Sequence, residues 1–155
     1  MSILVFERHT PRRLEEMYFY MVDPMKTSPQ GLFGIGVTVE NAVNQMKFVQ
    51  NVHKFENLLH EYVQVIFCFD VGVRANIGLL REVCERIGQV LITDKRQVFG
   101  AIHYLDKPDK IHCHYMINFV GIDGSLYRQN YSVKHYKLLI NEILSDYDMS
   151  PIKSC

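Results

Sequence analysis

The stretch FGAIHYLDKPDKIHCHYMINF, residues 99–119, decides the fold class of this protein. Two runs rich in β-branched, aromatic and other apolar residues flank the turn DKPD, whose proline and aspartates interrupt a strand. The sequence therefore predicts strands at 96–105 and 110–121, paired as an antiparallel hairpin at the centre of a sheet.

Three histidines share one face of this predicted hairpin. Alternate side chains of a strand point to the same face, so His112 and His114 stand about 6–7 Å apart along theirs. His103, on the partner strand, can reach the same side across the hairpin. Three neutral imidazoles on a rigid sheet form a good site for a divalent ion, with open positions for water or substrate oxygens.

The alternative is that these histidines are structural. A single H-x-H pair is weak evidence for a metal, because a histidine on a strand is usually a half-buried side chain with satisfied hydrogen bonds. The third histidine, on the partner strand, is the observation that favours a metal site. Both interpretations stay open on the residues alone.

The rest of the chain alternates predicted helices with a further strand. Thr38 is placed to cap a helix that runs to about residue 54, and residues 62–71 have the composition of a buried strand. Amphipathic patterns predict further helices at 76–92 and from Ser132 to about residue 147.

The N-terminal part is less regular. Residues 12–22 fit a short helix or a strand, and residues 23–36 are predicted to be a loop because prolines and glycines interrupt them. Together the elements predict an α+β fold, with a central antiparallel β-sheet and helices packed on it, covering one face.

Bulk composition restricts the class of protein. The chain has 155 residues, of which 48% are hydrophobic. This length and composition predict a single domain over residues 1–155, which is either a whole protein or the N-terminal domain of a longer one. No apolar run approaches the roughly 18 residues of a membrane span. The four cysteines show no C-x-x-C pairing, so we expect a reducing, cytoplasmic environment. Seventeen basic and seventeen acidic residues cancel, so a nucleic-acid partner would need a local basic patch.

Two motifs resemble one known family. The segment AIHYLDKPDKIHCHYMINFVGIDGSLY, residues 101–127, is similar to the histidine strand pair of the MobA/VirD2-like plasmid mobilisation relaxases, members of the HUH endonuclease superfamily. The segment YFYMVDPMKT, residues 18–27, resembles the family's nucleophile segment, Tyr-Ile-x-(Asp/Asn)-Pro-x-Lys-Thr. The resemblance covers roughly residues 14–147 and implies an HUH relaxase-like fold.

The resemblance also implies the site. In the family the three histidines hold a divalent ion, manganese or magnesium, and they correspond here to His103, His112 and His114. The nucleophilic tyrosine of the family falls on Tyr20, and Tyr18 is the fallback.

The implied activity is conjugative DNA processing. A relaxase nicks and rejoins one DNA strand at a plasmid origin of transfer, through a 5′-phosphotyrosine intermediate, with single-stranded origin DNA and accessory relaxosome proteins as partners. A basic track would hold the DNA, and the candidates for it are Arg12, Arg13, Lys26, Arg128 and Lys134.

The chain departs from the family pattern at three places. The DKPD turn lengthens the spacing between the first and second histidines, so His103 is the ligand that matches the pattern least well. Cys68 stands where the family has a serine, and Gln64 lies near the place of a usual histidine.

The sequence leaves two alternative functions open. A replication-initiator or transposase-like nuclease would carry its tyrosine after the histidine pair, at Tyr136 or Tyr147. A non-catalytic DNA-binding relative that keeps the fold is the other rival, which the neutral net charge favours.

Overall fold

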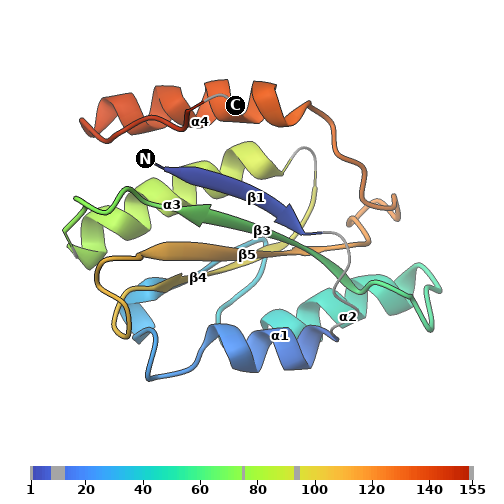
Figure 1. The fold of residues 1–155 in the computed structure, drawn as a ribbon. Coiled ribbons are helices and arrows are strands. Elements are labelled where there is room, and N and C mark those ends of the chain that lie inside the picture. Colours follow the sequence, from blue (N-terminus) through green and yellow to red (C-terminus); the bar gives the residue numbers. More distant parts are fainter. Residues whose placement is uncertain (1, 8–12, 75, 93–94, 154–155) are drawn as a thin grey trace.

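The computed structural model describes residues 2–7, 13–74, 76–92 and 95–153. Its strands are β1 (Ile3–Glu7), β2 (Leu32–Ile35), β3 (Tyr62–Cys68), β4 (Val98–His103) and β5 (His112–Asn118). They form one fully antiparallel sheet in the order β1-β3-β5-β4-β2, so the chain has an α+β fold with β5 at the centre (Figure 1).

The hairpin predicted from residues 99–119 is confirmed. Strand β4 pairs with β5 in a register that sets His103 opposite His112 and Ala101 opposite His114. Residues paired in this way point to the same face of an antiparallel sheet. All three histidines therefore share one face.

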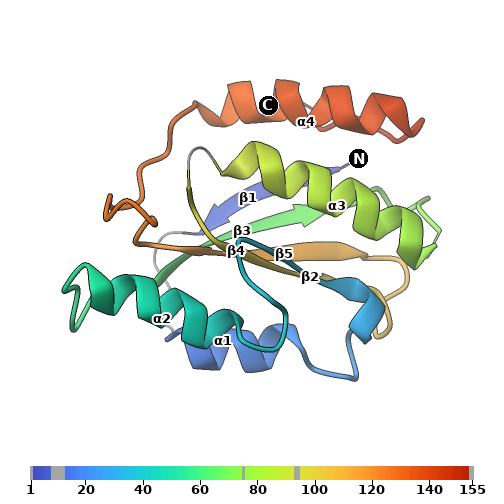
Figure 2. The same cartoon turned by 180° about the vertical axis from the view of Figure 1, so that it is seen from behind.

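Helices cover both faces of the sheet. The helices are α1 (Leu14–Met21), α2 (Ala42–Val52), α3 (Ile77–Leu91) and α4 (Val133–Asp146). Helices α3 and α4 lie on one face, and α1 and α2 lie on the other (Figures 1 and 2). Among the described residues, no helix combines the length and apolarity needed to cross a membrane.

The expectation of helices on a single face is wrong, because the central strand is buried on both sides. Tyr115 and Ile117 belong to the apolar core that includes α3 and α4. Met116 packs in a second core with Met17 of α1 and Met46 of α2. Side chains on both faces of β5 are buried, so each face of the sheet needs a layer of helices to cover it.

The sequence pattern misses both edge strands. Strand β1 pairs with β3 from Ile3 opposite Cys68 to Glu7 opposite Gln64. Strand β2 lies inside the segment 23–36 predicted to be a loop, and it pairs with β4. Both are short edge strands, so the partner strand defines them more than their own residues do.

The helix α1 lies within the segment that the sequence left open between helix and strand. The two predicted helix starts, at Thr38 and Ser132, differ in outcome. Helix α2 begins after Asn41 rather than at Thr38, whose backbone N–H instead donates to Gln45 Oε1 at 2.8 Å. Ser132 caps α4 as expected, because its hydroxyl oxygen accepts a bond from the backbone N–H of His135 at 3.2 Å.

Asn118, at the end of β5, joins the sheet to α2. Its side-chain oxygen accepts a hydrogen bond from Gln50 Nε2 at 2.9 Å. Its amide nitrogen donates to the Met46 carbonyl at 3.2 Å and to Gln97 Oε1 at 2.9 Å. Since Asn118 is fully buried, this network fixes where α2 sits.

Candidate metal centre and nucleophile

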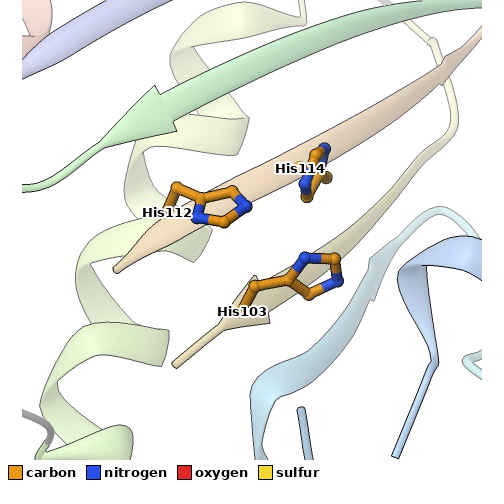
Figure 3. A group of neighbouring side chains, drawn as sticks. All are labelled: His103, His112 and His114. Atoms are coloured by element: carbon orange, nitrogen blue, oxygen red, sulfur yellow. The ribbon is translucent and has the colours of Figure 1, made fainter. Parts of the chain in front are cut away.

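The three histidines converge at one end of the central hairpin. His103 comes from the end of β4, and His112 and His114 come from the start of β5 (Figure 3). Their ring centroids lie 4.6 to 5.2 Å apart, and one nitrogen of each ring lies within 4.8 Å of the others. One divalent ion can be reached by all three rings at this spacing.

Each ring has one nitrogen held by a hydrogen-bond acceptor. His103 Nε2 lies 2.9 Å from the Met21 carbonyl oxygen, and His112 Nδ1 lies 2.8 Å from the Lys110 carbonyl oxygen. A carbonyl oxygen only accepts, so these two nitrogens carry the proton. His114 Nδ1 lies 3.1 Å from Gln64 Oε1 and donates in the same way.

These bonds fix the tautomers and leave a lone pair on the other nitrogen of each ring. The remaining nitrogens are Nδ1 of His103 and Nε2 of His112 and of His114. Donation of the second ring N–H to an oxygen is the usual arrangement around histidines that bind metals. The donor set therefore fits a divalent ion.

Burial favours the neutral form of His103. His103 is 1% exposed, and its Nδ1 is buried without a hydrogen-bond partner among the described residues. Burial lowers the pKa of His103, with the charge of His112 as a further cause, although the Met21 carbonyl opposes this. A neutral imidazole with an unused lone pair is what a metal requires.

Tyr20 lies against the histidines. Its ring centroid is 5.5 Å from that of His103 and 5.3 Å from that of His114. The residue is 37% exposed, and the ammonium nitrogen of Lys26 lies 4.0 Å from the centre of its ring. The structure thus brings together the tyrosine, the three histidines and one lysine.

Tyr18 points away from the histidines, because residues that are two positions apart on a helix differ by about 200° around its axis. Its hydroxyl donates to the Val39 carbonyl at 2.9 Å, and its ring packs on Phe99 at 5.0 Å. Burial raises its pKa, and the charge of Glu40 adds to this effect. This geometry makes Tyr18 a packing residue between α1 and the segment before α2.

Most of the predicted DNA contacts lie away from the histidines. Arg12 lies outside the described residues, and Arg13 pairs with Glu61 at 3.5 Å. Lys134 is exposed on α4, which covers the sheet face opposite the histidines (Figure 1). Of the four basic candidates that the structure describes, Lys26 is the one that lies at the site.

Arg128 lines a separate cavity of about 450 Å³ at the other end of β3. The other described residues that line it are His60, Tyr62, Val63, Phe119, Tyr127 and Gln129. Tyr62 and Val63 line the cavity, whereas Ile66 and Cys68 pair with His114 and His112, so the cavity and these histidines are separated by about 10 to 20 Å along β3.

The alternative tyrosines lie on the far side of the sheet. Tyr136 is 1% exposed and packs against Phe6 with ring centroids 5.4 Å apart. The Tyr147 hydroxyl donates to Glu82 Oε1 at 3.1 Å, at the end of α4. Neither reaches the histidines, so this geometry does not favour the tyrosine order of a replication initiator.

Two polar residues behind His114 were not predicted as part of the site. The sequence marks Gln64 only as a departure from the family pattern, but the strand register brings its side chain to His114. Glu7, on the unpredicted strand β1, in turn accepts a hydrogen bond from Gln64 Nε2. To identify Glu7 and Gln64 as neighbours of His114, one would have had to predict how β1, β3 and β5 pair.

Comparison with known proteins agrees with the motifs. The model of the MobA/VirD2-like relaxase nuclease domain matches residues 20–149. A solved structure described as the molecular basis of vancomycin resistance transfer in Staphylococcus aureus aligns with a TM-score of 0.49 at 12% identity, covering 99% of this chain and 74% of that one. No curated protein matches the chain. The family model matches most of the length of this chain, so the chain belongs to the MobA/VirD2-like relaxases.

Proposed function

We propose that this protein nicks and rejoins one strand of DNA at an origin of transfer, as a single relaxase-like domain acting in the cytoplasm. The reaction is site- and strand-specific, depends on a divalent ion and passes through a 5′-phosphotyrosine intermediate. The single observation that carries this proposal is the position of Tyr20, whose ring lies 5.3 Å from His114 and 5.5 Å from His103.

In the proposed step, the Tyr20 oxygen attacks the phosphorus of the scissile phosphodiester. The bond between phosphorus and the 3′-oxygen breaks, and the leaving 3′-oxygen takes up a proton as the phenol loses one. The number of phosphoester bonds is unchanged, so attack by a 3′-hydroxyl on the phosphotyrosine restores the strand. A single nucleophile suits one nick and one closure.

Lys26, whose ammonium nitrogen lies over the Tyr20 ring, supports this step. A phenol ordinarily has a pKa near 10, so at neutral pH its oxygen needs help to carry negative charge. The ammonium group of Lys26, 4.0 Å from the ring centre, stabilises the charge that develops on Tyr20. Lys26 is also placed to attract the phosphate backbone.

His103, His112 and His114 would hold the divalent ion through their three remaining nitrogens. When bound, such an ion acts as a Lewis acid on phosphate oxygens. All three donors are imidazole nitrogens, which suit a first-row transition ion better than Mg²⁺. We therefore expect Mn²⁺ to support the reaction more strongly than Mg²⁺.

A covalent-trapping experiment tests the proposal. Single-stranded oligonucleotides that tile the DNA flanking the gene are labelled at the 3′ or the 5′ end and mixed with protein and Mn²⁺, Mg²⁺ or EDTA. On a denaturing gel, the 3′ label should migrate with the protein, whereas the 5′ label should appear in a shorter free fragment. On duplex origin DNA, we expect accessory relaxosome proteins to increase the yield.

Two variants serve as controls in the same assay. Tyr20→Phe should abolish the adduct, and Tyr18→Phe should retain it. An adduct that survives in Tyr20→Phe would contradict the assigned nucleophile. The absence of an adduct on any strand, together with the absence of Mn²⁺ binding, would mean that the histidines are structural and would favour a non-catalytic relative.

A further inference from the structure

We propose that Glu7 and Gln64 form a relay that orients His114 for metal binding. This inference rests on the proposed function, because it concerns the same metal centre. It gives strand β1, at the sheet edge, a role in the chemistry at the centre of the sheet (Figure 1).

The relay consists of two consecutive hydrogen bonds across three strands. Gln64 Oε1, on β3, lies 3.1 Å from His114 Nδ1 on β5. Gln64 Nε2 donates to a carboxylate oxygen of Glu7 on β1. Glu7 and Gln64 are direct partners in the β1–β3 register, so backbone pairing holds the first two members of the relay together.

The Glu7 carboxylate determines which way the Gln64 amide is turned. A side-chain amide can present either its oxygen or its nitrogen to a neighbour, and only the oxygen can accept the His114 Nδ1–H. A carboxylate only accepts, so it requires the amide nitrogen on its own side. The oxygen is then turned toward His114, whose proton is held on Nδ1 and whose Nε2 keeps its lone pair.

The relay also strengthens His114 as a donor. Hydrogen bonds in a chain polarise one another, so a carboxylate bonded to the amide nitrogen makes the amide oxygen a better acceptor. A stronger acceptor at Nδ1 increases the electron density that Nε2 offers to a metal. Gln64 is 8% exposed, so water competes little for the bond to His114.

Metal affinity is the first readout. Mn²⁺ binding is measured by titration calorimetry for the parent, for Gln64→Met and for Glu7→Gln. Methionine keeps the length and burial of Gln64 but cannot accept the imidazole proton. We expect Gln64→Met to weaken the affinity by about 10- to 100-fold, and Glu7→Gln by less than about tenfold.

The matched control is Gln97→Met. Gln97 is another buried glutamine with two hydrogen bonds, to Gly36 and Asn118, but it lies away from the histidines. This variant loses similar hydrogen bonds without touching the relay. Its Mn²⁺ affinity should equal that of the parent.

A double-mutant cycle separates the relay from simple charge attraction. If Glu7 acts through Gln64, then Glu7→Gln should have no further effect on affinity in the Gln64→Met background. If the Glu7 charge merely attracts the cation through space, its effect will be the same in both backgrounds. That second result would overturn the relay.

The tautomer of His114 gives a readout that needs no metal. Imidazole ¹⁵N shifts of the metal-free protein, recorded near pH 8, report which nitrogen carries the proton. We expect a proton on Nδ1 of His114 in the parent and a mixture of tautomers in Gln64→Met. An unchanged tautomer together with unchanged Mn²⁺ affinity would refute the relay alone, whereas a parent that binds no Mn²⁺ would refute the metal centre itself.

Discussion

The ammonium nitrogen of Lys26 lies 4.0 Å from the centre of the Tyr20 ring. The backbone holds the lysine there, because the Lys26 carbonyl accepts hydrogen bonds from the N–H groups of Tyr104 and Leu105 at 2.9 and 3.1 Å. The loop after α1 is thereby tied to the end of β4, beside His103. The lysine and the tyrosine are both held beside the three histidines.

Replacing Lys26 by methionine should slow adduct formation. A partly exposed cation–π contact contributes about 1 kcal/mol, which corresponds to roughly fivefold to tenfold in rate if it acts mainly on the developing phenolate. Single-turnover formation of the adduct measures this, and Lys26→Arg should retain most of the rate. The control Lys134→Met, on the face of the sheet opposite the histidines, should leave the rate unchanged. Equal rates for Lys26→Met and the parent would contradict the proposed role of Lys26.

Tyr18→Phe should lower stability without lowering activity. The hydroxyl bond from Tyr18 to the Val39 carbonyl is lost, while the ring keeps its contact with Phe99. We expect the free energy of unfolding to fall by about 1 kcal/mol in a urea titration. Adduct formation should stay at the parent level, and a large loss would show that Tyr18 takes part in the chemistry.

Asn118→Leu should destabilise the fold strongly. The change leaves buried polar groups of Gln50 and Gln97 without their partner, and each such loss costs about 1–3 kcal/mol. Urea unfolding should show a total loss of about 2–4 kcal/mol. The control is Asn44→Leu, at an exposed position of α2. If Asn118→Leu lowers the free energy of unfolding no more than this control does, the network contributes little to stability.

Gly100→Ala should destabilise the sheet at β4. A Cβ at Gly100 would lie 2.1 Å from Cζ of Phe33, a fully buried ring that has little room to move. We expect a cost of about 1–3 kcal/mol in the free energy of unfolding. Gly72→Ala, where a Cβ meets no atom within 4 Å, is the matched control. Equal stability of the two variants would show that Phe33 relaxes freely.

The ion pair between Glu15 and Lys47 should make the attachment of α1 to α2 dependent on pH. The hydrogen bond from Lys47 holds the pKa of Glu15 below its ordinary value, against the opposing effect of burial. A carboxyl group with a lowered pKa stabilises the fold above its unfolded-state pKa, about 4.3, and loses that contribution as the pH falls through its folded-state pKa.

Thermal unfolding of the parent and of Glu15→Gln tests this dependence. Both side chains are more than a third exposed, so solvent screening limits the difference at pH 7 to less than about 1 kcal/mol. The difference should shrink as the pH falls through the folded-state pKa of Glu15 and vanish at a pH low enough to protonate the carboxyl group. A difference that persists at that pH would mean that packing, rather than charge, distinguishes the variant.

The sequence by itself determined the central part of the protein. The alternation of residues 110–121 predicted His112 and His114 on one face, because strand geometry has a period of two residues, and the predicted hairpin brought His103 to the same side. The amphipathic pattern of α3 and the Ser132 cap of α4 are equally local signals. The family resemblance added the assignment of Tyr20, which composition and periodicity could not supply.

Only the tertiary structure decided the rest. The edge strands β1 and β2 are defined by pairing with β3 and β4, and so no local pattern marks them. Tyr20 rather than Tyr18 lies against the histidines because of the way α1 docks on the sheet, where it packs against β4 and α2. Glu7, Gln64 and His114 are far apart in sequence and meet only through strand register, because contacts between distant residues depend on the assembled sheet.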